Sequence, residues 1–121
     1  HALALGDATI NRWFTAPFQA KDPGAVAKIR DMILSTEVKG FVGCSRAIQA
    51  MDQRETIKAI TAPTLIIVGA DDTGTTPDMA RDIQERIAHS HLTVLPEAAH
   101  LSNIEQAALF DAAVLEFLEA K

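Results

Sequence analysis

The run Thr64-Leu65-Ile66-Ile67-Val68, closed by Gly69, most constrains how this 121-residue chain can fold. Its continuous β-branched and aliphatic residues, without alternating polar positions, are typical of a strand that is buried on both faces. Such strands belong to parallel sheets that helices cover on both sides, and they need neighbouring strands at their edges. The run therefore predicts an α/β fold.

The residues after this strand repeat the same order of elements. A polar loop leads to Pro77, which opens a predicted helix over 77–88, and a second short strand follows over 91–95. The last helix is predicted over 103–119, with Ser102 and Glu105 as a capping box. The order strand, helix, strand, helix favours two parallel strands. Inward-facing side chains are expected at Met79, Ile83 and Ile87 in the first helix, and at Leu109, Phe110, Ala113, Val114, Phe117 and Leu118 in the last.

Residues 1–60 are predicted to be entirely helical. One helix is expected to begin with Asp22 as its N-cap and Pro23 at its first position, with Val26, Ile29 and Ile33 as its buried stripe. Another is expected over 41–51 and a short one over 54–59. Cys44 is expected to be a small core residue on the apolar face that it shares with Phe41, Ile48 and Met51.

Composition excludes several classes of function. The net charge of −5 and the absence of a basic stripe argue against nucleic-acid binding. No apolar run reaches the roughly 18 residues of a membrane span, and the first residues lack a signal-peptide pattern. The single Cys44 allows no internal disulfide, which fits the cytoplasm. His89 and His91 have no third ligand nearby, so neither a metal nor another cofactor is expected.

Titratable residues follow both predicted strands. Asp71 and Asp72 follow the first strand, and His100 follows the second. The carboxyl ends of neighbouring parallel strands lie at one edge of the sheet, where ligands bind in open α/β folds. A carboxylate there can orient an imidazole while the other ring nitrogen takes a proton from a nucleophile. The spacing alone leaves a second interpretation equally open, in which all three are polar loop residues without a role.

Four stretches of sequence carry a resemblance to a known family. The patterns are IxAPTLIIVGADDxxTTP at 60–77 and HLTVLPEAAHLSNIEQ at 91–106, together with RWFTAPF at 12–18 and GFVGCSRAIQAMDQRETI at 40–57. The chain resembles the C-terminal part of an α/β-hydrolase, and specifically the 3-oxoadipate enol-lactonase branch. The resemblance implies an all-helical cap segment with the return to the core over 1–60. It implies a core segment over 61–121 with two parallel strands and flanking helices.

By this resemblance Asp72 is the triad acid and His100 the triad base, with Asp71 as the next candidate acid. The family carries its serine nucleophile on a Gly-x-Ser-x-Gly elbow upstream of the cap. That elbow is missing here, because no serine has the flanking glycines. We therefore expect the chain to be inactive in isolation. We also expect its sheet to be completed by the N-terminal half of a hydrolase or by self-association.

The resemblance also implies a substrate. It would be an enol-lactone of aromatic catabolism, in the β-ketoadipate pathway, with Trp13 lining the pocket and Arg12 or Arg46 meeting its carboxylate. The simpler interpretation is that Trp13 packs between helices and that both arginines are solvated. Two other functions stay open: an α/β-hydrolase for another ester, carbon–carbon or haloperoxidase-type substrate, and a non-catalytic oligomeric binding module.

Overall fold

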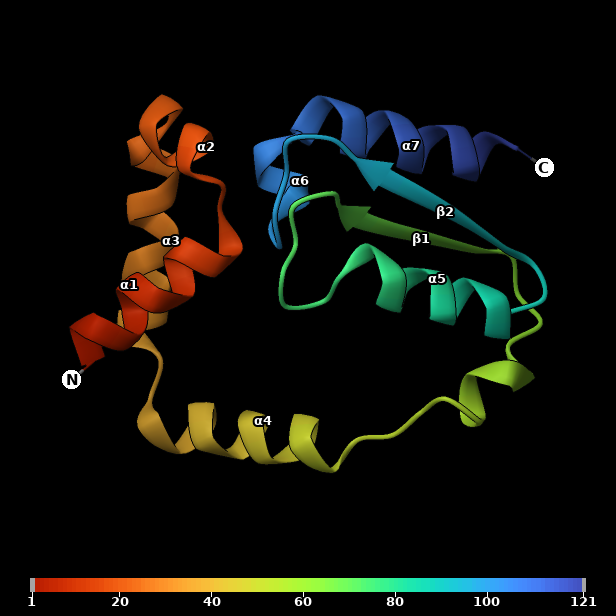
Figure 1. Cartoon of the computed structure of the whole chain (residues 1–121), viewed down its shortest axis with the longest axis horizontal. Helices are drawn as coiled ribbons and strands as arrows, with labels where there is room; N and C mark the ends of the chain where they lie inside the picture. The colour runs from red at the N-terminus through yellow and green to blue at the C-terminus, as the bar shows by residue number, and fades with distance from the viewer. Residues whose placement is uncertain (1, 121) are drawn as a thin grey trace.

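The computed structural model of the chain describes residues 2–120 (Figure 1). Helices form the first half, and two strands with their flanking helices form the second. In chain order the elements are α1 (Ala2–Trp13), α2 (Ala16–Lys21), α3 (Pro23–Ser35), α4 (Val38–Ala50), the 3₁₀-helix η1 (Thr56–Ala59), β1 (Thr64–Gly69), α5 (Pro77–Arg86), β2 (Ser90–Leu95), α6 (Ser102–Glu105) and α7 (Ala107–Glu119).

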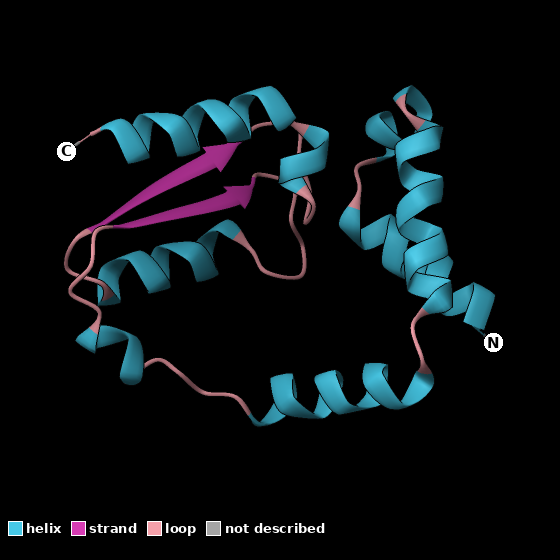
Figure 2. Ribbon diagram, turned by 180° about the vertical axis from the view of Figure 1, so that it is seen from behind, coloured by secondary structure: helices cyan, strands magenta, loops and turns pink. Residues whose placement is uncertain are grey.

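The two strands form a parallel sheet between two helices. The register runs from Thr64 opposite Ser90 to Gly69 opposite Leu95. Helices α5 and α7 both contact the two strands, and they lie on opposite sides of the sheet (Figures 1 and 2). This arrangement confirms the predicted order of strand, helix, strand, helix.

Burial of β1 is less complete than its sequence predicts. Val68 and Gly69 are buried, whereas the side chains from Thr64 to Ile67 are only half-buried. The sheet formed by the described residues has only two strands, so each strand keeps one open edge. The expectation of a strand buried on both faces is therefore met only at its carboxyl end, where the loops that follow β1 and β2 meet.

Helices α1, α2 and α3 form a separate packed unit. Helix α1 packs against α3, and the most buried apolar residues of the unit are Ile10 in α1 and Phe14 directly after it. Phe14 also stacks on Phe18 of α2, with ring centroids 5.4 Å apart. Both views place this unit beyond the carboxyl ends of the strands, where the arrowheads point (Figures 1 and 2). It therefore stands over the edge of the sheet where a site was predicted.

The N-cap of α3 confirms a prediction from the sequence. Asp22 accepts a hydrogen bond from the backbone N–H of Ala25, and Pro23 occupies the first helical position. The predicted buried stripe is weaker, since Val26, Ile29 and Ile33 are only half-buried.

Helix α4 corrects the prediction for Cys44. The helix lies apart from the sheet along one side of the molecule (Figure 1), and Cys44 is exposed rather than part of a core. Its apolar neighbours Phe41, Ile48 and Met51 are exposed as well. The amphipathic pattern is present, but no described element packs against it closely enough to exclude water.

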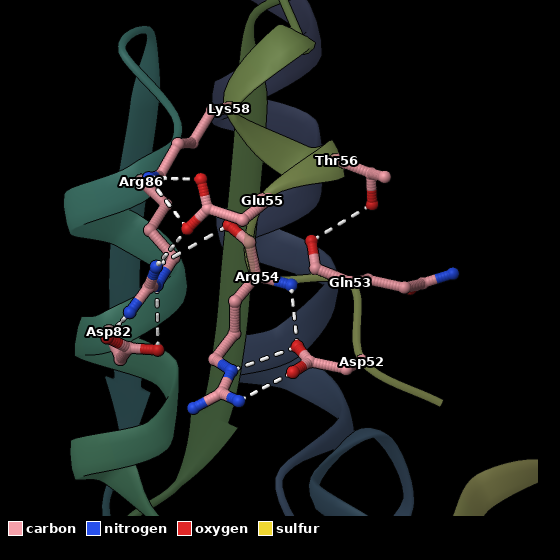
Figure 3. A network of polar contacts seen from close by, with 8 residues as sticks. All are labelled: Asp52, Gln53, Arg54, Glu55, Thr56, Lys58, Asp82 and Arg86. Atoms are coloured by element: carbon pink, nitrogen blue, oxygen red, sulfur yellow. Dashed lines mark hydrogen bonds and ion pairs between the residues drawn. The ribbon is translucent and has the colours of Figure 1, made fainter. Parts of the chain in front are cut away.

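The segment after α4 is joined to α5 through Arg86 (Figure 3). The Arg86 guanidinium donates two hydrogen bonds to Asp82 and one to the carbonyl oxygen of Arg54, and it lies 3.8 Å from a carboxylate oxygen of Glu55. Arg54 in turn pairs with Asp52. These groups remain accessible to solvent, which screens their charges, so each pair contributes little to stability. Together these contacts hold the segment before β1 against α5.

Two predictions in the second half are corrected. Of the three residues predicted to face inward around α5, Ile87 just after the helix is buried as expected, whereas Met79 and Ile83 are exposed and Ala80 is the buried residue within the helix. The last helix is broken at Gln106 into α6 and α7. In α7 the predicted stripe is half-buried at Phe110, Ala113, Val114 and Phe117 but exposed at Leu109 and Leu118.

The capping box is also wrong, since α6 has no side-chain cap at its start. The pattern Ser102-x-x-Glu105 satisfies the local rule. However, the Glu105 carboxylate finds buried donors elsewhere in the structure.

Candidate active site

The Asp72 carboxylate takes part in four hydrogen bonds, three of them with the loop after β1. The backbone N–H groups of Gly74 and Thr75 each donate to Oδ1 at 2.9 Å, and the Thr75 hydroxyl donates to Oδ2 at 2.8 Å. The fourth partner of the carboxylate is His100, whose Nδ1 lies 2.8 Å from Oδ2. Asp72 is only 5% exposed. Its position is therefore fixed by the loop and closed to bulk water.

His100 is brought to Asp72 from the loop after β2. With Nδ1 protonated, the ring donates to Asp72, and this fixes the tautomer in which Nε2 carries a free lone pair. The Thr75 hydroxyl oxygen also lies 3.1 Å from Nδ1. The His100 side chain is 37% exposed, so its outer edge remains accessible. The prediction that the two loops meet agrees with this geometry.

The pKa of Asp72 lies below its ordinary value. Burial of the carboxylate by itself raises the pKa. The hydrogen bonds that it accepts from His100, Thr75 and Gly74 act in the opposite direction and outweigh burial. Asp72 is therefore ionised at neutral pH, as a group that stabilises an imidazolium must be.

Gly69 allows the two loops to approach. A Cβ atom at this position would collide with the backbone carbonyl oxygens of Ala98 and Ala99. A backbone hydrogen bond also links the two loops here, since the N–H of Asp71 donates to the carbonyl of Ala98 at 2.9 Å. A residue without a side chain is thus required at the end of β1, immediately beside the segment that carries His100.

Trp13 stacks against His100. The ring centroids are 5.9 Å apart and the planes differ by 28°. The backbone carbonyl of Trp13 also accepts a hydrogen bond from the N–H of Leu101 at 3.1 Å. The α1 helix therefore contacts the histidine through both a side chain and the backbone.

Glu105 is a site residue that the sequence reading missed. It is 8% exposed, and one carboxylate oxygen accepts from the N–H and the hydroxyl of Thr15 at 2.8 and 2.7 Å. The other oxygen accepts from the N–H of Ala99, the residue before His100. The sequence signal was present, but the local spacing favoured a capping box over a contact across 90 positions of chain.

A cavity of about 610 Å³ lies beside these loops, between them and the α1–α2 junction. Arg12 and the exposed Asp71 are among its lining residues, whereas Trp13, Asp72 and His100 are not. Arg46 lies on the exposed surface of α4 and does not line the cavity. Of the three predicted substrate-binding residues, the structure therefore places Trp13 against the histidine, Arg12 on the cavity wall, and Arg46 at neither place.

Within residues 2–120 no serine hydroxyl forms a hydrogen bond with His100. Ser35 and Ser90 donate instead to backbone carbonyl groups of their own neighbourhoods. No group of three His, Cys, Asp or Glu side chains in this part of the chain is placed to hold a metal ion, and both His89 and His91 are exposed. No described helix has the length and apolarity needed to cross a membrane.

Known proteins match this chain over most of its length. Residues 4–107 match the family model for the alpha/beta hydrolase fold. The chain is 36% identical over 110 residues to 3-oxoadipate enol-lactonase 2 of Acinetobacter baylyi, and this alignment covers 91% of the chain and 41% of that protein. The chain thus spans less than half the length of this curated relative.

Solved structures agree with the sequence matches. The enol-lactonase of Burkholderia xenovorans superposes with a TM-score of 0.93 at 38% identity, over 97% of this chain and 45% of that one. A hydrolase from Pseudomonas aeruginosa gives a TM-score of 0.90 at 34% identity, over 97% of this chain and 44% of that one. These matches confirm the fold expected from the sequence, and the chain belongs to the α/β-hydrolase fold family.

Proposed function

We propose that this chain supplies the acid and the base of the catalytic triad of an enol-lactone hydrolase, with Asp72 as the acid and His100 as the base. The single observation that carries the proposal is the 2.8 Å contact between Asp72 Oδ2 and His100 Nδ1, made by a buried carboxylate and a partly accessible imidazole. The likeness to 3-oxoadipate enol-lactonases supports the substrate class. The serine nucleophile would come from a segment outside these 121 residues.

The chemistry follows from the free lone pair on Nε2 of His100. That nitrogen takes the proton of the serine hydroxyl as the serine oxygen attacks the lactone carbonyl carbon. The ring C–O bond then breaks, and the enol oxygen leaves with the proton that His100 returns. A water molecule, deprotonated by the same nitrogen, attacks the acyl-enzyme, and the serine oxygen leaves with the proton that His100 returns. The released enol tautomerises to the 3-oxo dicarboxylate. Asp72 stays ionised throughout and stabilises the imidazolium.

Recognition of the substrate's carboxylate is assigned to Arg12. It lines the cavity beside the α1–α2 junction, and no ion pair to it is found among residues 2–120. A guanidinium without a protein partner can bind a carboxylate through two parallel hydrogen bonds.

The lone cysteine remains the basis for expecting a cytoplasmic protein.

The test is hydrolysis of 3-oxoadipate enol-lactone by a hydrolase in which this segment is joined to a serine-bearing half. We expect His100→Gln and Asp72→Asn to lower kcat by about 10³-fold or more, because a triad loses most of its effect when one member is removed. Arg12→Lys, which keeps the charge, should raise KM and leave kcat nearly unchanged.

Two results would contradict the proposal. One is full activity of the joined enzyme with His100→Gln. The other is ester hydrolysis by the purified 121-residue chain at a rate that depends on His100, because the proposal places the nucleophile elsewhere.

A further inference from the structure

The Glu105 carboxylate joins two segments that meet at His100. Its Oε1 accepts from both the N–H and the hydroxyl of Thr15, and its Oε2 accepts from the N–H of Ala99. Thr15 lies two residues after Trp13, whose ring stacks on His100, and Ala99 directly precedes His100. Figure 1 shows the α1–α2 junction beside α6, the helix that carries Glu105. One buried side chain thus bridges the α1–α2 junction and the loop that holds the histidine.

Burial of the Glu105 carboxylate has to be compensated by hydrogen bonds. Glu105 is 8% exposed, and no Lys, Arg or His pairs with it among the described residues. Removing a charge from water is costly unless hydrogen bonds replace the lost solvation, and here three donors do so. All three donors belong to Thr15 and Ala99. The hydrogen bonds that make this burial tolerable are therefore the same ones that hold the two segments together.

The contact requires a carboxylate rather than any polar group of the same size. Both oxygens act as acceptors, and two of the three donors are backbone N–H groups that cannot reverse their role. A glutamine would place an NH₂ group against one of these N–H groups. It could keep the hydrogen bond to Ala99 or the one to the Thr15 N–H, but not both.

We infer that Glu105 is a positioning residue that holds the His100 ring between Trp13 and Asp72 by fixing the α1–α2 junction to the histidine loop. The inference deepens the proposed function, on which it rests, because it concerns the base of the same triad. Glu105 acts through Thr15 and Ala99, and it makes no hydrogen bond with the imidazole itself.

The spectroscopic test uses the full chain and needs no activity. Trp13 is the single tryptophan and the chain has no tyrosine, so its fluorescence reports on the stacked His100 ring. The intensity and the maximum of this emission at neutral pH should therefore change when the stacking on His100 is lost. The His100 Nδ1–H shared with Asp72 should give a low-field proton resonance in NMR spectra of the ¹⁵N-labelled protein.

Glu105→Gln should broaden or remove that resonance, and it should change the Trp13 emission at neutral pH, while the helical circular dichroism is retained. The matched control is Glu85→Gln, which makes the same chemical change on the exposed surface of α5 and should alter neither signal. Thr15→Val removes one of the three donors and leaves the carboxylate, so it should cause a smaller loss of the same kind. If Glu105→Gln does not fold, Thr15→Val decides the question.

In the joined hydrolase, Glu105→Gln should lower kcat by about 10- to 100-fold with little change in KM, as expected when a catalytic group is displaced rather than removed. A folded Glu105→Gln chain with an unchanged resonance and unchanged Trp13 emission would overturn the inference. So would an unchanged resonance in Thr15→Val when Glu105→Gln cannot be folded. A joined enzyme without lactonase activity, combined with the loss of the resonance in Glu105→Gln, would refute the proposed function and leave the positioning role standing.

Discussion

Gly69 shows at the scale of one residue how the end of β1 is matched to the loop after β2. Its missing side chain leaves space for the carbonyl oxygens of Ala98 and Ala99, and these carbonyls lie beside the histidine. The close approach is a packing requirement of the backbone. It does not depend on a left-handed conformation, since no glycine among the described residues has a positive φ.

Gly69→Ala is therefore expected to destabilise the fold by about 1–3 kcal/mol, as overpacking does. The measurement is the free energy of unfolding from urea denaturation. Gly43→Ala is the matched control, because a Cβ atom there meets nothing within 4 Å and alanine favours a helix over glycine by about 0.5–1 kcal/mol. Equal effects of the two substitutions would contradict the close approach of the two loops.

Asp72→Asn tests the buried carboxylate at the same scale. The variant keeps the size of the side chain but loses acceptor capacity toward its donors, so the free energy of unfolding at neutral pH should fall by about 1–3 kcal/mol. Asp71→Asn is the control, because Asp71 is exposed and its carboxylate makes no hydrogen bond among the described residues; its effect should stay within about 0.5 kcal/mol. A larger loss in Asp71→Asn would make Asp71 the structural acid.

The direction of the Asp72 pKa shift also predicts a pH dependence. A carboxyl group whose pKa is lower in the folded state stabilises the fold fully above its unfolded pKa, and this contribution is lost as the pH falls through the folded pKa. The wild-type chain should therefore lose stability as the pH falls below 3.8, the ordinary pKa of an aspartic acid side chain such as Asp72. Asp72→Asn should flatten this part of the plot of stability against pH. Denaturation curves at a series of acidic pH values measure this. Parallel curves for the two proteins would contradict the prediction.

At the scale of elements, α4 differs from the other long helices described because no helix or strand packs closely against it. Its apolar face is exposed, with Ile48 at 66% and Phe41 at 46%. Helices in globular proteins gain most of their stability from packing of the apolar face, because isolated helices of this length are marginal in water. The sequence of α4 therefore predicts a packing surface, but no element among the described residues covers it.

We expect the backbone amides of α4 to exchange with solvent faster than those of α5, a helix that packs on the sheet. Hydrogen–deuterium exchange followed by mass spectrometry of peptides from the two helices measures this difference. Slower exchange in α4 than in α5 would mean that another surface covers α4 in solution.

At the scale of the whole molecule, the two-stranded sheet leaves edges and apolar surface open. A sheet of two parallel strands is not stable by itself, and exposed strand edges favour pairing with further strands. We expect the purified chain to self-associate, so that light scattering after size exclusion gives masses above 13.0 kDa that decrease on dilution. Ile48→Lys separates the contribution of α4 from that of the sheet, because it adds charge to the α4 face alone. A monomer of 13.0 kDa at every concentration would contradict the expectation.

The sequence by itself determined the order of strand, helix, strand, helix and the α/β-hydrolase family, and it predicted that Asp72 and His100 follow neighbouring parallel strands. Apolar runs, proline positions and the Asp22 cap are local signals, and local chemistry predicts them well. The positions of Asp72 and His100 after parallel strands follow from the rule that strand ends lie at one edge of a sheet.

Tertiary structure alone decided which side chains are buried and which distant groups meet. Periodicity gives the apolar face of a helix, but it does not say whether anything covers that face, and so the prediction that Cys44 is a core residue is wrong. The Ser102-x-x-Glu105 pattern fits a local helix cap. In the structure Glu105 instead accepts hydrogen bonds from Thr15, because the fold brings these donors next to the buried carboxylate. Such contacts depend on the packing of segments far apart in the chain, and no local window of sequence contains that information.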